Sequence, residues 1–476
     1  MVDLPEEFNV AYKLERILEL NLLDCRDQSR IIYPLFVIGT VIVMAKMAKC
    51  ENCWAIREYW RVNLPLLKER IYGLGDEIPT AQTIRRVQTI LNTENLHQVF
   101  VEYFTAKREY VNLPKSAIAL KDRDVISADG QNIRATRSHA TGDARNTTGY
   151  DVVSMYSSKY GLTLAQKTVD KKGQEAECIK ELLNLVIVKN AILTWDAINT
   201  HPDTINAVVG AGADAVTCLK ENCGLIYDDV VTAFEYFDKG KFPGEYAQSS
   251  QVTSEHGRIE EKTITVLEFK YCATKTVRKK WKHIKCAIRV RTKRTEKISG
   301  KVTENDAYFI TTIDLDGLNP EEFAAQMQQI ILQRWAIEAR HFIIDCYFEQ
   351  DRLPLRNQDY ISNSTFFTKE AVNILSWNRE QLPERYKRKI SFPNLQVLCS
   401  RADVCIAMLD AYFNKDISYI RKEEEVAKLF YGEEEPTGND VPENLEETGF
   451  QSSINDDTPL GQFARTRKKI KGKRRD

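Results

Sequence analysis

Three acidic residues stand where their carboxylates could act on one ligand. Asp129 closes the β-rich run "DVISADG", and Asp196 directly follows the apolar run "AILTW". Each is therefore expected at the carboxyl end of a strand, where open α/β sheets carry their chemistry. Glu338 lies in "ILQRWAIEARHFIIDCYFEQ", residues 331–350, which predicts a helix. An unpaired buried carboxylate costs several kcal/mol, so a carboxylate there needs a compensating partner.

The spacing of the helix places this acid on an apolar stripe. At 3.6 residues per turn one side collects Ile331, Trp335, Glu338, Phe342 and Asp345. We expect the apolar members to hold the helix on a sheet while Glu338 faces a ligand. Asp345 receives no catalytic role.

Carboxylates brought together repel one another unless cations neutralise them. Hard divalent ions accept such oxygen ligands, and two ions about 3.5 to 4 Å apart activate water and stabilise the leaving oxygen of a phosphodiester. For Asp129 or Asp196 alone, a simple turn after a strand is the more ordinary explanation. A metal site therefore depends on all three acids meeting.

The elements that would bring them together follow a clear order. Three β-rich runs lie in residues 124–169, followed by the helical "EAECIKELLNLVIV", the strand "AILTWDA", the helix "TINAVVGAGA" and the strand "DAVTCLK". This βββαβαβ order predicts a mixed α/β sheet. Neighbouring strands would carry Asp129 and Asp196, and a later helix across the sheet would present Glu338.

Helical and polar segments flank this core. Residues 14–110 read as helices, and one of them carries Arg85 and Arg86, which could approach phosphates or form a solvated face. Residues 369–415 read as further helices. The segment 431–459 is acidic and poor in apolar residues, which favours disorder, and the chain closes with the basic "RTRKKIKGKRRD". That tail suits nucleic acid or a nuclear address.

Composition limits the classes of function. The 476 residues carry a net charge of −1, so binding to nucleic acid must come from local basic patches. Eleven cysteines without a regular frame suit free thiols, and the pair in "KCENCW" lacks further metal ligands. The N-terminus has no cationic secretory signal, and the apolar run from Pro34 is too short for a membrane span.

The densest basic stretch runs from Arg278 to Lys297, within strand-like residues 251–315. Along a strand, Arg289, Arg291 and Lys293 alternate to one face. That face would line a groove for a DNA backbone, or would be the charged face of an edge strand that discourages aggregation.

The segments "SADGQNIR", "TWDA", "CLKEN", "HGRIEEKTITV" and "QRWAIEARHFIID" occur in this order. Together they resemble the transposases of the H-repeat-associated class of insertion sequences, which use a DDE catalytic triad on a ribonuclease-H-like fold. The resemblance runs from the N-terminal helices to about Arg352. Its most specific piece is "HGRIE", residues 256–260.

The resemblance implies the catalytic triad Asp129, Asp196 and Glu338, holding two Mg²⁺ or Mn²⁺ ions. It implies double-stranded DNA as partner, both element ends and target, a homodimer in the DNA complex, and a cytoplasmic, nucleoid-associated protein, or a nuclear one in a eukaryote, without membrane attachment. Cationic or polar residues in matching or basic segments are the predicted DNA contacts: Arg134, Lys220, His256, Arg258, Arg289, Arg291 and Arg334.

The expected architecture is α/β: a ribonuclease-H-like mixed sheet with its catalytic helix, a β-rich insertion, an N-terminal all-helical domain and a helical C-terminal region. The boundaries expected for these parts are 1–115 for the N-terminal helical domain, for which DNA binding is one expected role, 116–221 and 319–355 for the catalytic core, 222–318 for the insertion, 356–430 for the C-terminal helices and 431–476 for the tail.

Gln131, Glu221 and Ala339 depart from the family pattern. They motivate one alternative, a domesticated derivative that binds DNA without cutting it. A second alternative is a nonspecific ribonuclease-H-like nuclease with the same metal chemistry. A minimal nuclease needs neither the insertion nor the N-terminal helices.

Overall fold

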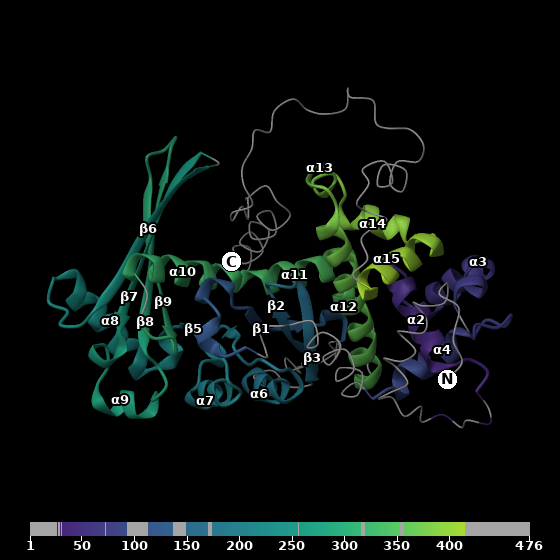
Figure 1. Cartoon of the computed structure of the whole chain (residues 1–476), viewed down its shortest axis with the longest axis horizontal. Helices are drawn as coiled ribbons and strands as arrows, with labels where there is room; N and C mark the ends of the chain where they lie inside the picture. Colours follow the sequence, from purple (N-terminus) through teal and green to yellow (C-terminus); the bar gives the residue numbers. More distant parts are fainter. Residues whose placement is uncertain are drawn as a thin grey trace, which may run out of the picture. The chain divides into compact units, whose positions relative to one another are not determined.

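The computed structural model describes residues 26, 29, 31–71, 73–92, 113–136, 149–169, 174–255, 257–315, 319–352 and 357–414 (Figure 1). The chain forms two compact units. Unit 1 comprises Met1–Cys218 and Ile330–Glu433, and unit 2 comprises Leu219–Gln329 and Glu434–Asp476. The three candidate acids all belong to unit 1.

Unit 1 is built on a mixed sheet in the order β3-β2-β1-β4-β5. Strand β1 pairs antiparallel with β2 and parallel with β4; β2 pairs antiparallel with β3, and β4 pairs parallel with β5. The bounds are β1 Val125–Asn132, β2 Asp151–Ser157, β3 Leu162–Val169, β4 Ile192–Thr194 and β5 Asp214–Leu219. Helices α6 (Glu175–Leu185) and α7 (Pro202–Gly210) connect the later strands. The observed βββαβαβ order confirms the mixed α/β prediction.

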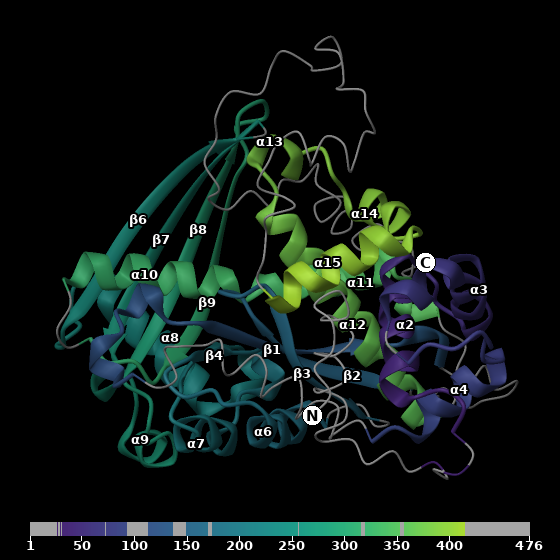
Figure 2. The same ribbon diagram turned by 45° about the vertical axis from the view of Figure 1, so that its right-hand side comes forward.

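Both faces of this sheet are covered. Helices α6 and α7 lie side by side on one face, and α11 (Trp335–Tyr347) crosses the other, where it packs on β1 (Figures 1 and 2). Because both faces are packed, β2 and β5 are buried along nearly their whole length. Such strands read as continuous apolar runs and not as alternating ones.

A long central helix, α12 (Gln358–Gln381), joins the sheet to the terminal helices. It is buried through most of its length and uses polar contacts on the sheet side. The amide of Gln166 donates to the Ser362 carbonyl at 2.9 Å, and Asn373 accepts from the Thr163 N–H at 2.9 Å. On its other side, Asn363 donates to the carbonyl of Gln88 at 2.7 Å. Satisfied polar groups fix the register of a buried helix more tightly than apolar contacts alone.

The N-terminal helices α2 (Leu35–Met47), α3 (Cys53–Arg70) and α4 (Ala81–Ile90) pack together beside α12. Helix α2, which contains the apolar run noted in the sequence, is buried on nearly every side, as a core helix should be. None of the helices in the described ranges is both long and apolar enough to cross a membrane. Shorter C-terminal helices complete the unit: α13 Glu384–Lys387, α14 Phe392–Leu398 and α15 Ala402–Asn414.

Unit 2 is an antiparallel meander with helices. Its sheet has the order β9-β8-β7-β6. The strands are β6 Tyr246–Glu255, β7 Arg258–Glu268, β8 Cys286–Glu296 and β9 Val302–Thr311, with helices α8 Leu225–Asp238 and α9 Lys275–Lys280. The β-rich character was predicted, but α8 and β6 were not recognised. The polar "YAQSSQVTSE" of β6 lacks the apolar alternation that identifies a strand.

The helix that carries Glu338 is divided in two. Helix α10 (Pro320–Gln333) ends before Arg334, whose N–H bonds to the Ile331 carbonyl, and α11 starts at Trp335. The backbone of Arg334 stays helical, and the buried residues Ile330, Ile337 and Ile344 continue on one face across it. The buried face of α11 is Ile337, Arg340 and Ile344, whereas Trp335 is 43% exposed. The expectation that Trp335 anchors the helix to the sheet was therefore wrong.

Candidate active site

The pairing of β1 with β4 aligns two of the predicted acids. The register pairs Ser127 with Thr194, so Asp129 and Asp196 occupy equivalent positions two residues further along. Asp129 lies inside β1, which continues to Asn132. Asp196 follows the end of β4 and caps the short 3-10 helix Ala197–Asn199 by accepting the Ala197 N–H at 2.8 Å. Parallel pairing thus brings both residues to one edge of the sheet.

Helix α11 brings the third acid to β1. His341 Nδ1 lies 3.6 Å from Asp129 Oδ2, and Glu338 stands one turn earlier on the same helix. The Glu338 side chain is 40% exposed and accepts from Arg334 Nη1 at 3.4 Å. Glu338 is therefore not buried in an apolar stripe, because the buried face of α11 is formed by Ile337, Arg340 and Ile344 and Glu338 lies beside it.

The carboxylates of Glu338 and Glu175 lie close enough to Asp129 to affect its pKa. Burial, the Glu338 carboxylate and the Glu175 carboxylate, in that order, raise the pKa of Asp129 to about 7. The Gly130 N–H and Arg334 oppose this shift. Burial, with smaller effects from Lys369 and Arg340, lowers the pKa of His341 to about 3. A neutral imidazole therefore faces Asp129 at physiological pH, and it supplies no positive charge to offset the acids.

Glu175 is a fourth acid that the sequence argument missed. It stands in the first turn of α6, and Asn199 Nδ2 donates to its Oε2 at 2.8 Å. A Cβ at position 130 would lie 2.7 Å from Glu175 Oε1, so Gly130 leaves the space in which this carboxylate approaches β1. An acid at a helix start usually only complements the helix dipole, which is why its spacing gave no signal.

The donor set fits a hard divalent cation, although the acids do not yet converge. In the described ranges no three His, Cys, Asp or Glu side chains are gathered closely enough to hold an ion. Asp196 is turned onto its helix cap and Glu338 toward Arg334. The raised pKa of Asp129 shows uncompensated negative charge that a cation would relieve. Oxygen donors of this type suit Mg²⁺ and Mn²⁺.

A second polar cluster lies beyond Asp129 on β1. Gln131 is 4% exposed, and its Nε2 donates to Asp345 Oδ1 at 2.6 Å. Burial and Asp351 raise the pKa of Asp345 to about 6. Arg134, a predicted DNA contact, forms an ion pair with Asp351. Since Gln131 faces inward, its departure from the family pattern changes no surface charge.

The other predicted contacts occupy varied settings. In unit 1, Arg334 lies over the Trp335 ring at 4.5 Å and pairs with Glu338. In unit 2, Lys220 is exposed before a short 3-10 helix, and Arg258 starts β7 opposite Glu296. His256 lies outside the described residues. No role as a DNA contact is tested by these positions.

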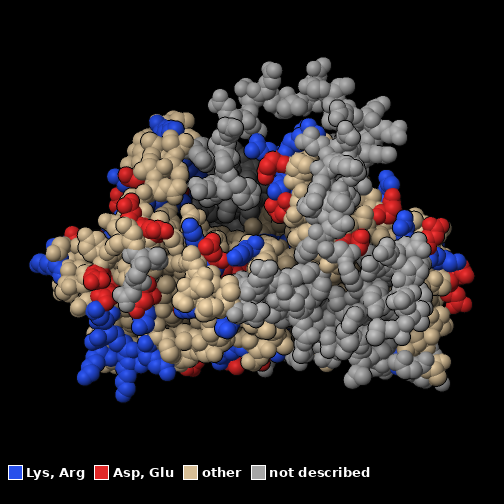
Figure 3. Space-filling view, in the orientation of Figure 1, with Lys and Arg blue, Asp and Glu red and all other residues tan. Residues whose placement is uncertain are grey.

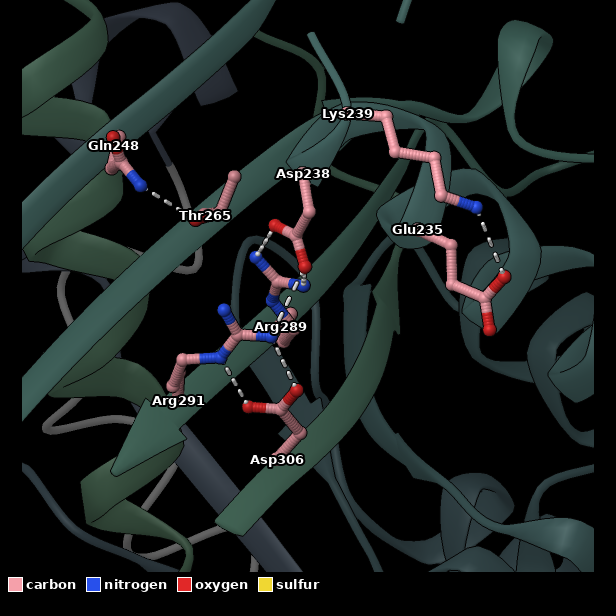
Figure 4. A network of polar contacts seen from close by, with 8 residues as sticks. All are labelled: Glu235, Asp238, Lys239, Gln248, Thr265, Arg289, Arg291 and Asp306. Atoms are coloured by element: carbon pink, nitrogen blue, oxygen red, sulfur yellow. Dashed lines mark hydrogen bonds and ion pairs between the residues drawn. The ribbon is translucent and has the colours of Figure 1, made fainter. Parts of the chain in front are cut away.

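Arg289 and Arg291 belong to a polar network between β8, β9 and α8 (Figure 4). The terminal nitrogens Nη1 and Nη2 of Arg289 donate to Asp238, at 2.8 and 2.7 Å, and only 5% of the Arg289 side chain is exposed. Arg291 bridges Asp238 and Asp306. The hydrogen bonds from Arg289 and Arg291 lower the pKa of Asp238. Guanidinium groups matched in this way stabilise the insertion and are poorly available to phosphates.

Exposed cations of unit 2 gather over α9 and the turn after it (Figure 3). Residues 275–285 contain no acid, and six of their cations are exposed: Lys275, Arg278, Lys279, Lys280, Lys282 and Lys285. Val277 and Trp281 are buried and anchor the segment to the unit. The basic stretch seen in the sequence is thus divided into an exposed part on α9 and a paired part on β8.

The family comparison matches the elements that carry the acids. The domain described as "Transposase DDE domain" matches residues 120–363, and the "DDE_Tnp_1-associated" domain matches residues 19–104. The chain belongs to the DDE-domain transposase family. The first match covers every strand of the unit 1 sheet, α11 and the start of α12, and the second covers α2, α3 and α4.

Curated relatives of this family share about a quarter of their residues with the chain. "Putative transposase YncI" of Escherichia coli O157:H7 is 25% identical over 356 residues, 74% of this chain and 84% of the relative. "H repeat-associated putative transposase YhhI" of Escherichia coli K12 is 25% identical over 372 residues, 74% of this chain and 88% of the relative. These names confirm the family resemblance stated from the motifs.

One solved structure, a piggyBac transposase synaptic complex with hairpin DNA, aligns with 92% of this chain and 87% of its own. The TM-score is 0.33 and the identity 12%. Scores at this level support no argument about geometry, so the DDE-domain assignment rests on the family match.

Proposed function

We propose that the chain is a DNA transposase that cleaves the ends of its element and joins them to target DNA by a metal-dependent DDE mechanism on a ribonuclease-H-like core. The observation that carries this proposal is that the pairing of β1 with β4 aligns Asp129 with Asp196 while the Glu338 carboxylate contributes to the raised pKa of Asp129, within the segment that matches the DDE domain. The order and pairing of the strands support the ribonuclease-H-like assignment.

In this mechanism Asp129, Asp196 and Glu338 hold Mg²⁺ or Mn²⁺ through their carboxylate oxygens. When bound, two such ions activate water or a 3′-hydroxyl and stabilise the leaving oxygen. Asp129 gives up the proton that burial and Glu338 retain on it near neutral pH. Glu338 would serve the ions in place of its contact with Arg334, and the Arg334 guanidinium would then be available to a DNA phosphate. No covalent intermediate with the protein forms.

The test is cleavage of element ends with Mg²⁺ or Mn²⁺. We expect Asp196→Asn to reduce the rate by roughly three orders of magnitude or more while DNA binding is kept. Asp203→Asn, an exposed acid on α7, is the matched control and should cleave normally. Cleavage by Asp196→Asn at the parent rate contradicts the site. Equal cleavage of random duplex identifies a nonspecific nuclease instead.

For the DNA partner we propose the exposed cations of α9 as a backbone contact. Phosphate contacts dominate affinity and make it depend on salt. We expect Lys279→Ala with Lys280→Ala to lower the salt dependence of DNA binding by about two phosphate contacts. Lys270→Ala is the control, since Lys270 pairs with Glu268. An unchanged slope in the double variant rejects this surface.

The domesticated, non-cleaving derivative remains the second candidate. It is favoured by the incomplete convergence of the acids, because Asp196 is engaged as a helix cap. The burial of Gln131 weakens the case, since that departure changes no surface charge. DNA binding without cleavage in either metal decides for this candidate. The homodimer is a separate proposal from resemblance, and light scattering of the complex with end DNA tests it.

A further inference from the structure

A cavity of about 520 Å³ opens among the N-terminal helices, far along the chain from the carboxylates. It lies between the starts of α3 and α4 and the first turn of α12. Among the residues that line it are Asn52, Trp54, Arg57, Gln82, Arg85 and Tyr360. Its lining, all of it in the described part of unit 1, includes two arginines and no acidic residue.

The two arginines give this cavity its charge. The guanidinium of Arg85 lies 6.0 Å from the centre of the Tyr360 ring, and no described carboxylate is within ion-pair distance of it. Arg57 is about one-third exposed and forms an ion pair at 2.8 Å with the neighbouring Glu58, which lies outside the lining of the cavity. Two cations without an acid in the wall favour an anionic ligand.

The helix starts add to this field. Helix α3 has 18 residues and α4 has 10, and neither carries an acid in its first turn. Each helix start presents about half a positive charge and N–H groups without intrahelical partners. Asn52 caps one of these groups on α3, the Ala55 N–H, and Thr80 caps one on α4, the Thr83 N–H. The remaining polarity is directed toward the same space that the arginines line.

An aromatic ring stands at the mouth of the cavity. Trp54, in the first turn of α3, is 68% exposed, although an indole is usually buried. An exposed indole beside cations is the combination with which proteins hold single nucleotides: phosphate on the cations and base on the ring. A free inorganic anion would use the cations but not the ring.

We propose that this cavity binds a phosphate of a DNA strand through Arg57 and Arg85, with a neighbouring base against Trp54. The proposal rests on the function proposed above and adds a second DNA contact in unit 1. It gives the N-terminal helices a role in holding DNA. The chemistry at the carboxylate site does not itself require these helices.

The test compares two pairs of arginines on the same two helices in the full chain. Arg57→Ala with Arg85→Ala removes both cations from the cavity. Arg61→Ala with Arg86→Ala makes the same charge change outside its lining. We expect the first variant to bind end DNA roughly tenfold more weakly with a salt slope lower by about two, and the second to bind nearly as the parent does.

A third variant separates binding from folding. Gln82→Glu puts a negative charge in the first turn of α4, which complements the helix dipole and keeps or raises the melting temperature. The same charge repels a phosphate, so DNA binding should fall. Trp54→Ala should weaken single-stranded DNA more than duplex.

Equal DNA affinity in the two arginine pairs, or unchanged binding by Gln82→Glu, overturns the proposal. The proposal is also overturned if inorganic phosphate stabilises the protein only when Arg57 and Arg85 are present, while DNA binding does not depend on these two arginines. The proposed function is judged separately by cleavage. If the parent protein cleaves element ends and the cavity variants bind DNA as the parent does, only the cavity proposal is rejected. If the parent never cleaves and the cavity variants bind DNA more weakly, only the transposase mechanism is rejected.

Discussion

Two groups of acids, one in each unit, have opposite electrostatic surroundings. Asp129 faces the carboxylates of Glu338 and Glu175 and a neutral histidine, and its pKa is raised to about 7. Asp238 faces Arg289 and Arg291, and its pKa is lowered. In the first arrangement like charges repel one another, whereas in the second opposite charges neutralise one another within the fold.

The difference separates a site from a scaffold. Arginine and carboxylate that are matched bidentately need nothing from outside, and they hold α8 against β8. Like charges held together cost stability that only an added cation returns. Removing one partner should therefore destabilise the matched network but relieve the carboxylate site.

The largest effect is expected in unit 2. Asp238→Ala leaves the buried guanidinium of Arg289 without its carboxylate. We expect a loss of about 2 to 3 kcal/mol, less than for a fully buried pair because the Asp238 side chain is 39% exposed. Chemical denaturation measures the loss.

Glu235→Ala, on the same helix, is the control and should cost no more than about 0.5 kcal/mol, since its pair with Lys239 is exposed (Figure 4). Replacing both partners, with Asp238→Leu and Arg289→Met, should recover much of the loss. If Asp238→Ala unfolds at the parent denaturant concentration, the network does not stabilise the unit.

A smaller effect of opposite sign is expected at Asp129. Its folded pKa exceeds its unfolded value of about 4, so the folded state binds more protons between these values and stability falls as pH rises from about 4 to about 7. Asp129→Asn removes this decline. Without divalent ions, the variant should gain about 1 to 2 kcal/mol on the parent between pH 5 and pH 8, allowing for water around the partly exposed side chain.

The measurement is the difference in the free energy of unfolding between parent and variant, because other buried groups titrate in the same pH range. Adding Mn²⁺ should restore the parent at pH 8 and leave Asp129→Asn nearly unaffected. Parallel pH profiles for the two proteins would contradict the clustering of the acids.

The smallest effect is expected from Glu175→Gln. The amide keeps the shape and an acceptor for Asn199 but removes one negative charge beside Asp129. The pH midpoint of the stability decline should move down by less than about one unit, since burial and Glu338 contribute more to the shift. Glu181→Gln, an exposed acid on α6 paired with Lys167, is the control. Coincident midpoints for the Glu175 and Glu181 variants would exclude Glu175 from the site.

Sequence patterns predicted the sheet well because its strands are short apolar runs separated by clear turns. They missed β6, whose polar residues are held by pairing with β7, a contact distant from any local signal. They also placed Trp335 on the buried face of α11, because Ile330, Ile337 and Ile344 form a second stripe at helical spacing beside the one that was chosen. His341 lies three residues after Glu338, a spacing that places both side chains on one side of a helix. Sequence patterns indicated no partner for His341, because its partner Asp129 lies on β1.

The sequence by itself determined the order βββαβαβ, the two strand-associated aspartates and the family, since these depend on local periodicity and on motifs. The tertiary structure decided which charges meet. It buried Arg289 against Asp238, left the lysines of α9 exposed and brought Glu175 to Asp129. The sequence determines which residues can carry charge. The effect of each charge depends on its burial and on its neighbours, and only the packed fold determines these.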